Sequence, residues 1–448
     1  MHADISRDTF DPAGGILRVI QEQGALLTDA AANEQTAILL YRMQMLALDL
    51  FGPFWGPVGK GLDGKPLCGF EIKWDNTTKN YTIGTGRYHV GGRLCESNAT
   101  TGQDGKPALY TLANQPTYPW TLADDVKTFV VYLDVWEREI TEAELLAAGR
   151  PVPDPTSPRT RLTWQVKTAP VAVAALVALK TSLQAPDPYV ALKALCDQVG
   201  VSFKPRTRPT LQAKLEGTGT TVYQSYRVEI HRGGNFSTGE PTFKWARDNG
   251  SVVFPLEADY GKVDVASKMI VVKLAHGFLD DRTSLKKGQW VEYIDRGTEF
   301  DPDAAAMTRL FYVEEVDDKV VTLATSSTTP IVLPVLSADA DRWPMLRRWD
   351  FKPDATANDG LPLTGDWLDL ENGIQIMFAT GDYRAGDYWL IPVRAADGLR
   401  WPDSGVPARE VEHHLAPLAT VDRTGSLVVT DFRRAIPSPT FTPPPPSP

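Results

Sequence analysis

The chain has few cysteines for its length and no long apolar run. Cys68, Cys95 and Cys196 are an odd and widely spaced set among 448 residues. This pattern is typical of buried free thiols, with a single bridge between Cys68 and Cys95 as the alternative. The most apolar stretch, residues 170–179, is far shorter than the roughly 20 residues that a membrane-spanning helix needs. We therefore expect no transmembrane segment.

We also expect neither a secretory signal nor a basic surface. Residues 1–4 include an acid, and neither a cationic nor an apolar region follows them, so we expect synthesis and folding in the cytoplasm. The formal net charge is −10, with 46 Lys and Arg against 56 Asp and Glu. The acidic residues are spread along the chain and not gathered in a tail. Such a charge distribution argues against nucleic acid as a partner.

Motifs for catalysis or metal binding are weak. Glu412, His413 and His414 are adjacent, but neighbouring side chains point apart on a strand and on a helix, so they do not readily share one ion. The loop with Glu299, Asp301 and Asp303 lacks the spacing and central glycine of a calcium loop. Three acid pairs fall where turns are expected and where Asp bonds locally: Asp124-Asp125, Asp280-Asp281 and Asp317-Asp318. We expect no catalytic residue, no cofactor and no metal.

Residues 28–51 carry the strongest helical signal. Thr28 and Asp29 suit the start of a helix, and Gly52 followed by proline suits its end. One seam recurs at spacings of three and four: Ile38, Tyr41, Met45 and Leu48. Further apolar residues lie on other faces: Leu39, Leu40, Met43, Leu46 and Leu50. A helix that is apolar on several sides is either enclosed in its own domain or packed against copies of itself.

After this helix the pattern predicts a mainly β chain of the α+β kind. Residues 128–137 are β-branched and aromatic without a break, which is typical of a central strand. The turn at Asn249-Gly250 predicts a tight hairpin, and Asp317-Asp318 predicts another. Residues 386–394 read as a strand buried on both sides. Short strands without alternating helices indicate β-barrel or β-sandwich modules.

Within residues 141–225 the pattern departs from β. Helices are expected at 143–148 and 189–198, and residues 161–167 alternate like an isolated strand. The last twelve residues hold seven prolines and predict an extended tail. The chain is thus expected to have five consecutive segments: an N-terminal docking or oligomerisation module with a helix and small sheet (1–140), a helical insertion (141–225), two β domains (226–335 and 336–436) and the tail (437–448).

Five further runs stand out along the chain: SRDTFDP (6–12), GRYHVGGRLCES (86–97), FKWARDNGSVVFP (243–255), GDYWLIPVR (386–394) and HHLAPLA (413–419). Together they resemble an uncharacterised family of bacterial proteins that occur with contractile injection systems and phage-tail-like particles. The resemblance covers nearly the full length, apart from the expected insertion and tail. The resemblance implies no catalytic residue in this chain, because none is assigned in the family. Its first half is similar to the N-terminal module of baseplate and tail-fibre proteins, in which such modules associate around a symmetry axis.

The resemblance implies a structural role as a baseplate, tail-fibre or attachment protein. The implied partners are baseplate, sheath or tube proteins and further copies of the chain, in a trimer or another oligomer. In that role Ile38, Tyr41, Met45 and Leu48 would be the docking seam of the helix. The protein would be made in the cytoplasm and assembled into a particle that is released or attached to a membrane.

The twelve tryptophans support a second hypothesis from a different class. In β-rich domains most tryptophans belong to the core. Trp343 and Trp401 each precede a proline in an expected loop, where an indole can also stack on a sugar ring. The alternative function is therefore a glycan- or receptor-binding surface module. A glycan depolymerase is the less favoured third reading.

Overall fold

The computed structural model describes residues 2–59, 68–101, 105, 107–140, 158–182, 188–199, 206–217, 224–264, 266, 268–278, 280–295, 310–324, 343–351, 360–394 and 398–436. It contains two compact units, each made of separate stretches of chain. The first unit comprises residues 1–36, 139–160 and 206–411, and the second comprises residues 37–138, 161–205 and 412–448. The fold is mainly β, as the sequence predicts.

The first unit contains a sandwich of two sheets. In sheet order, the first sheet is β22 (Leu368–Asp369), β23 (Ile374–Phe378), β11 (Thr210–Leu215) and β27 (Val406–Pro407). The second is β21 (Leu361–Pro362), β14 (Thr242–Ala246), β12 (Gln224–Arg232), β25 (Tyr388–Arg394) and β26 (Gly398–Leu399). A two-stranded ribbon, β13 (Gly234–Asn235) with β24 (Asp382–Tyr383), accompanies them.

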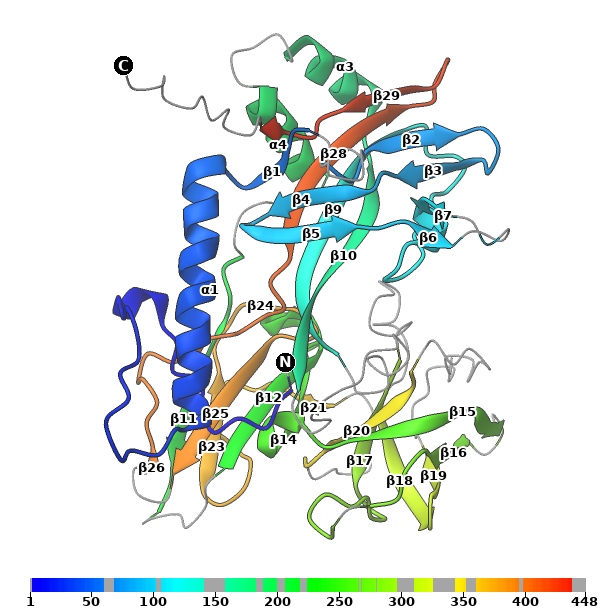
Figure 1. Ribbon diagram of the computed structural model, residues 1–448. Coiled ribbons are helices and arrows are strands. Elements are labelled where there is room, and N and C mark those ends of the chain that lie inside the picture. Colours follow the sequence, from blue (N-terminus) through cyan, green and yellow to red (C-terminus); the bar gives the residue numbers. More distant parts are fainter. Residues whose placement is uncertain are drawn as a thin grey trace, which may run out of the picture. The chain divides into compact units, whose positions relative to one another are not determined.

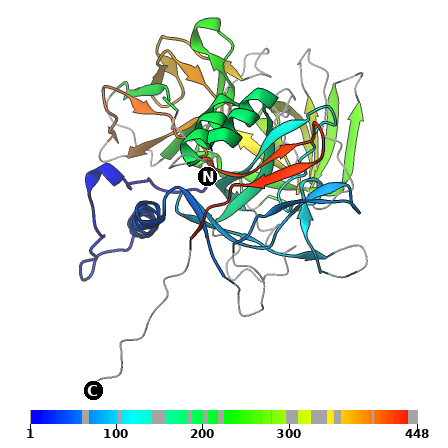
Figure 2. The same cartoon turned by 90° about the horizontal axis from the view of Figure 1, so that it is seen from above.

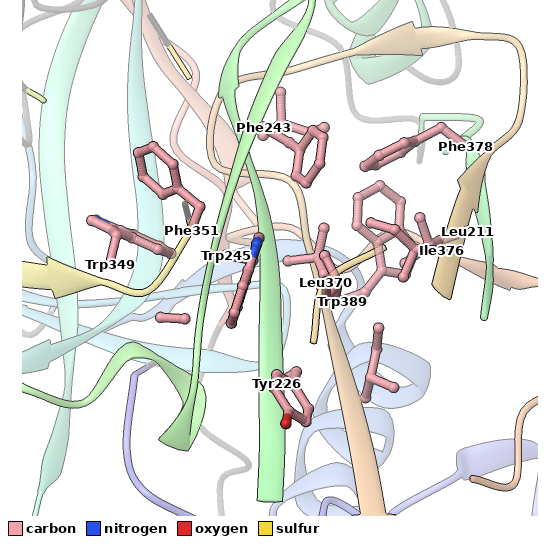
Figure 3. Close-up of a cluster of buried hydrophobic side chains, with 14 of the residues drawn as sticks. Leu211, Tyr226, Phe243, Trp245, Trp349, Phe351, Leu370, Ile376, Phe378 and Trp389 are labelled. Carbon is pink, nitrogen blue, oxygen red and sulfur yellow. The ribbon is translucent and has the colours of Figure 1, made fainter. Parts of the chain in front are cut away.

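The inner faces of these two sheets form one aromatic core. Figure 3 shows side chains of β12, β14 and β25 facing Ile376 and Phe378 of β23. Trp389 of β25 is buried, and its indole N–H donates to the Val406 carbonyl at 2.8 Å. Alternate residues of β25 are buried while the others are half-buried. The prediction that this strand is buried on both sides is therefore wrong, because only one of its faces meets the other sheet.

A closed six-stranded barrel is inserted into the sandwich between β14 and β21. In barrel order its strands are β15 (Val253–Asp264), β16 (Met269–Leu274), β19 (Val320–Ala324), β18 (Leu310–Asp317), β17 (Trp290–Ile294) and β20 (Met345–Trp349). Figure 1 shows these strands together, from green to yellow. The hairpin expected at Asp317-Asp318 is confirmed, since β18 pairs with β19 and Asp318 has a positive φ of 52°.

The turn at Asn249-Gly250 does not make the expected hairpin. Both residues have positive φ, as such a turn requires, and they lie in a short 3-10 helix, η4 (Asp248–Gly250). However, β14 pairs with β12 and β21, whereas β15 pairs with β16 and β20. The turn is therefore the passage from the sandwich to the barrel. Three other short 3-10 helices are η1 (Pro12–Gly14), η2 (Leu112–Asn114) and η3 (Phe236–Thr238).

The second unit is built on two four-stranded sheets and two smaller ones. The first, in order, is β10 (Arg159–Pro170), β9 (Thr128–Ile140), β28 (His414–Asp422) and β29 (Val428–Asp431). The second is β30 (Ala435–Ile436), β1 (Phe54–Pro57), β4 (Gly86–Val90) and β5 (Arg93–Ser97). The smaller sheets are β2 (Ile72–Asp75), β3 (Asn80–Ile83) and β8 (Tyr110–Thr111), and β6 (Thr100–Thr101) with β7 (Pro107–Ala108). The expected central strand is confirmed, because β9 lies between β10 and β28 (Figure 1).

The described helices are α1 (Asp29–Phe51), α3 (Val173–Ser182) and α4 (Pro188–Gln198). Figure 2 shows α3 and α4 side by side. They share an apolar cluster with β9 and β10 that includes Val130, Leu176, Leu192 and Cys196. The expected helix at 189–198 is confirmed, and the one at 143–148 lies outside the described residues. No described helix is both long and apolar enough to cross a membrane.

Strand pairing divides the chain differently from the five consecutive segments expected above. The strand expected to be isolated, residues 161–167, belongs to β10 and lies beside β9. From the same expected insertion, β11 enters the sandwich. β28 and β30, from the expected second β domain, pair with β9 and β1. The three cysteines are free: Cys95 and Cys196 are buried and Cys68 is half-buried, so the alternative of a Cys68–Cys95 bridge is wrong.

Candidate docking surface

Helix α1 has defined ends that satisfy its backbone groups. At its start, the Thr28 hydroxyl accepts a hydrogen bond from the Ala31 N–H at 3.2 Å. At its end, Gly52 has a φ of 85°, and its N–H donates to the Leu48 carbonyl at 2.8 Å. The Arg434 guanidinium donates to the Phe51 carbonyl, also at 2.8 Å. These contacts satisfy backbone N–H and C=O groups that have no partner within the helix at its two ends. The helix predicted for residues 28–51 is confirmed, with observed bounds Asp29–Phe51.

The seam expected to dock onto other subunits faces the chain itself. Ile38 is only 1% exposed, and Tyr41, Met45 and Leu48 are half-buried. These four residues therefore share the covered face of α1. Their role as the docking seam stays a prediction, and the burial of Ile38 does not favour it.

A glycine lets the covered face approach the turn between β4 and β5. A Cβ placed on Gly92 would lie 2.5 Å from the Gln44 carbonyl oxygen, so the helix backbone and the turn are in direct contact. The run GRYHVGGRLCES contains this turn. Near the end of the helix, the Phe51 and Trp55 rings lie 4.4 Å apart, and the Trp55 ring stacks on His89 at 4.0 Å. Contacts within the second unit thus hold α1 along one side.

The opposite face of α1 carries apolar side chains that the chain leaves exposed. Their exposed fractions run from 50% to 69%: Leu39, Leu40, Met43, Leu46 and Leu50. We call this set the outer face. A contiguous exposed apolar patch rimmed by polar residues marks an interaction surface, whereas single exposed apolar residues do not. The sequence shows these residues as apolar positions on other faces of the helix, but periodicity alone does not say which face is covered.

The opening run SRDTFDP is fastened at several points within the first unit. The Ser6 N–H and hydroxyl both donate to the Asp29 carboxylate at 2.7 Å, and Thr9 donates to Glu34 at 2.5 Å. Asp8 pairs with Arg409 at 2.5 Å. Burial alone would raise the pKa of the Asp29 carboxyl, but the hydrogen bonds from Ser6 and from the helix start outweigh it and lower that pKa. The run therefore stabilises the start of α1.

A buried charge network lies in the first unit, where the sandwich meets the barrel. Glu229 of β12 pairs with Arg227 at 2.6 Å and with Lys244 at 3.2 Å. Lys244 also pairs with Glu292 of β17 at 2.6 Å, and the indole N–H of Trp349 donates to the same carboxylate. Burial by itself would raise the pKa of Glu229, but the two cations hold it well below its usual value. The ion pair between Lys244 and Glu292 therefore connects the sandwich to the barrel.

The N-terminal segment enters this network. The His2 ring lies 3.2 Å from the Glu229 carboxylate and 2.9 Å from the Arg347 guanidinium. Burial, with the charges of Arg227 and Arg347, holds the pKa of His2 well below its usual value. The side chain of Asn249 donates to the Ala3 carbonyl at 2.7 Å. The surroundings of His2 thus favour a neutral ring, which packs the N-terminal segment into the network.

The two histidines of Glu412-His413-His414 have different surroundings. The His413 ring lies 2.7 Å from the Asp134 carboxylate, which Lys167 also contacts at 2.7 Å. Burial, Arg93 and His413 lower the pKa of His414 to about 4. Among the described residues, no group of three His, Cys, Asp or Glu side chains is arranged to hold a metal ion. The residues of the acidic loop, Glu299, Asp301 and Asp303, lie outside the described part of the chain.

One residue of the acid pairs, Asp280, and one of the two loop tryptophans, Trp401, have hydrogen-bond partners within the first unit. Asp280 accepts from the Thr283 N–H at 2.7 Å and from its hydroxyl at 2.8 Å, which is the turn bonding expected of such an Asp. The indole N–H of Trp401 donates to the Leu211 carbonyl at 2.9 Å, and the ring packs against the sandwich core. Trp343 is half-buried and has a φ of 44°. Sugar stacking stays a prediction, which the anchored geometry of Trp401 does not favour.

The chain belongs to a family of unknown function, DUF6519, whose model matches residues 1–201 and 210–428. The matched residues include most of the expected insertion (141–225), so the family model covers this segment as well. No curated protein matches the chain. A solved structure titled "Crystal structure of TssK" aligns with 81% of this chain and 98% of that chain, at 9% identity and a TM-score of 0.17. A likeness this low bears on neither fold nor function.

Proposed function

We propose that this protein is a non-enzymatic structural subunit that is built into a contractile injection system or phage-tail-like particle through the outer face of α1. The observation that carries the proposal is the exposure of five large apolar side chains along one side of a well-capped helix. Removing such side chains from water is the main source of stability in protein assembly. The proposed partner is therefore a neighbouring subunit that covers this face.

The interior of the protein also supports an assembly role. Lys244 and Glu229 are both buried in the first unit and are paired with each other. Ion pairs of this kind fix how two modules join. The motif resemblance described above supplies the class of particle.

A pull-down of the full chain from particle-producing cells tests the proposal. We expect baseplate, sheath or tube proteins to co-purify with the wild-type chain. The variant Met43→Glu/Leu46→Glu places two charges on the outer face and should lose these partners while keeping its fold. Val190→Glu on α4 is the matched control, since Val190 is also exposed, at 66%, but lies elsewhere. Recovery of no particle protein by the wild-type chain would overturn the proposal.

A further inference from the structure

The outer face of α1 has the spacing of a coiled-coil seam. Leu39, Met43, Leu46 and Leu50 follow one another at intervals of four, three and four residues. This alternation places them at the core positions of a heptad, where side chains of one helix insert between those of another. The covered residues Ile38, Tyr41, Met45 and Leu48 occupy the remaining positions on the opposite side. The surface that α1 presents is thus shaped for a second helix.

The two edges of this seam differ in charge. Arg42 and Asp49 are exposed and lie seven residues apart, on the same edge. At this separation they are too far apart on one helix to pair with each other. Leu40, which is exposed, and Ala47, which is half-buried, occupy the other edge, also seven residues apart. One edge therefore carries one positive and one negative charge, and the other carries none.

We infer that α1 pairs with α1 of a second copy of this chain in an antiparallel, two-fold arrangement. In this register Leu39 lies against Leu50 of the second copy, and Met43 lies against Leu46. The same register places Arg42 opposite Asp49, and the two-fold axis repeats this ion pair. Leu40 meets Ala47 along the apolar edge. Every position of the seam thus finds a complementary position on an identical helix, as a self-complementary contact requires.

Charge decides the direction of the two helices. In a parallel pair, each residue at the position of Arg42 contacts the residue five positions further along the other helix, which is Ala47. Both Arg42 and Asp49 then lack a partner of opposite charge. A parallel trimer, the arrangement that a fibre would favour, has the same mismatch. The antiparallel dimer satisfies both charges and is the arrangement that the side chains support.

This inference rests on the proposed role of the outer face in assembly, and it names the subunit that covers that face. The seam has four core layers, so the buried area is at the small end of specific interfaces. We expect a monomer–dimer equilibrium with a dissociation constant of about 1–100 µM. Sedimentation equilibrium of the full chain over this concentration range measures it directly.

Charge reversal tests the register. Arg42→Asp alone places two acids opposite each other at both ends of the seam and should weaken the dimer about tenfold, and Asp49→Arg should do the same with two bases. The double variant Arg42→Asp/Asp49→Arg restores both pairs with exchanged signs and should return to the wild-type constant. A double variant that dimerises as weakly as the single variants would overturn the antiparallel register.

Cysteine pairing gives an independent readout of direction. A mixture of Met43→Cys and Leu46→Cys chains should form a mixed disulfide dimer faster than either variant alone, because only the mixture brings both thiols into one layer. The unsubstituted chain is the control for its three native cysteines. Faster pairing of each variant with itself would indicate a parallel dimer and contradict the inference.

The outcomes also separate this inference from the proposed function. A chain that stays monomeric at 100 µM but co-purifies with particle proteins would overturn the self-pairing and leave the assembly role standing. A dimer with the expected disulfide pattern that recovers no particle protein would support the self-pairing and count against the proposed role as a particle subunit.

Discussion

The guanidinium of Arg394, the last residue of β25, donates a hydrogen bond to the backbone carbonyl of Ser6. This contact joins the opening run SRDTFDP to the run GDYWLIPVR, although the two residues are 388 positions apart in the chain. Ser6 in turn donates to Asp29 at the start of α1. One chain of hydrogen bonds therefore links a strand of the sandwich to the helix through the N-terminal segment.

Loss of this link should loosen the N-terminal segment. We expect Arg394→Ala to lower the local opening free energy of residues 6–10 by about 1–3 kcal/mol, because a charged donor to a carbonyl is removed. Hydrogen exchange of the Ser6 amide, which donates to Asp29, measures the effect. Arg7→Ala is the control, since Arg7 is exposed in the same segment. Equal exchange in the two variants would show that Arg394 does not hold the segment.

The buried network should be sensitive to the removal of a single charge. Glu229→Gln leaves Arg227 and Lys244 without their shared carboxylate in a site where the three side chains are 9%, 3% and 3% exposed. Breaking a buried pair in this way costs about 3–5 kcal/mol. Urea unfolding at pH 7 measures the loss. At the exposed pair of Lys273 and Glu257, the variant Glu257→Gln should cost less than about 1 kcal/mol. Similar losses at the two sites would contradict the structural role of the network.

Acid should destabilise the protein through His414. Its folded pKa is about 4, below the usual value of 6.5, so between these values the unfolded chain binds the proton more tightly than the folded chain. Stability is therefore complete above about pH 6.5 and falls as the pH decreases towards 4. We expect His414 to contribute about 2 kcal/mol to this fall, less than the full pKa difference allows, because the ring is 24% exposed. The measurement is the pH dependence of the unfolding free energy.

The pKa of His2 is also lowered, so this residue too makes the folded protein less stable as the pH falls. It contributes to the pH dependence of the unfolding free energy in the wild-type chain and in the variant alike. The variant His414→Asn removes one titrating group and should therefore have a shallower slope between pH 4 and 6.5 than the wild-type chain. A slope that does not change would show that the His414 ring is accessible to protons in the folded state.

Contact between α1 and the β4–β5 turn should depend on Gly92. Gly92→Ala introduces a Cβ within 2.5 Å of the Gln44 carbonyl oxygen at a backbone φ of 75°, so it combines a clash with a strained backbone. We expect a loss of about 3 kcal/mol or more in unfolding free energy. Gly105→Ala is a matched control, because Gly105 has a φ of 74° and no atom of the described residues lies within 4 Å of the added Cβ. The control should show only the strain, about 1 kcal/mol. If both variants lose the same amount, the close approach contributes nothing to stability.

Local signals predicted the elements whose determinants are local. Thr28 and Gly52 bound a helix because a cap and a left-handed glycine act on adjacent backbone groups. The β18–β19 hairpin follows from the residues of its own turn. The turn at Asn249-Gly250 has the same local signature, but each of its flanking strands has a partner far away in the chain, since β14 pairs with β21 and β15 pairs with β20. Pairing with distant strands depends on long-range burial, which no short window of sequence records.

The amino-acid sequence by itself determined the mainly β class and the bounds of α1, because periodicity and capping express these properties directly. Tertiary structure alone decided that Ile38 is covered while Leu39 and Met43 are exposed. It also decided that the barrel interrupts the sandwich and that Glu229 meets Lys244. These features arise when distant segments compete to bury the same apolar surface and to neutralise the same charges, and the outcome depends on the packing of the whole unit.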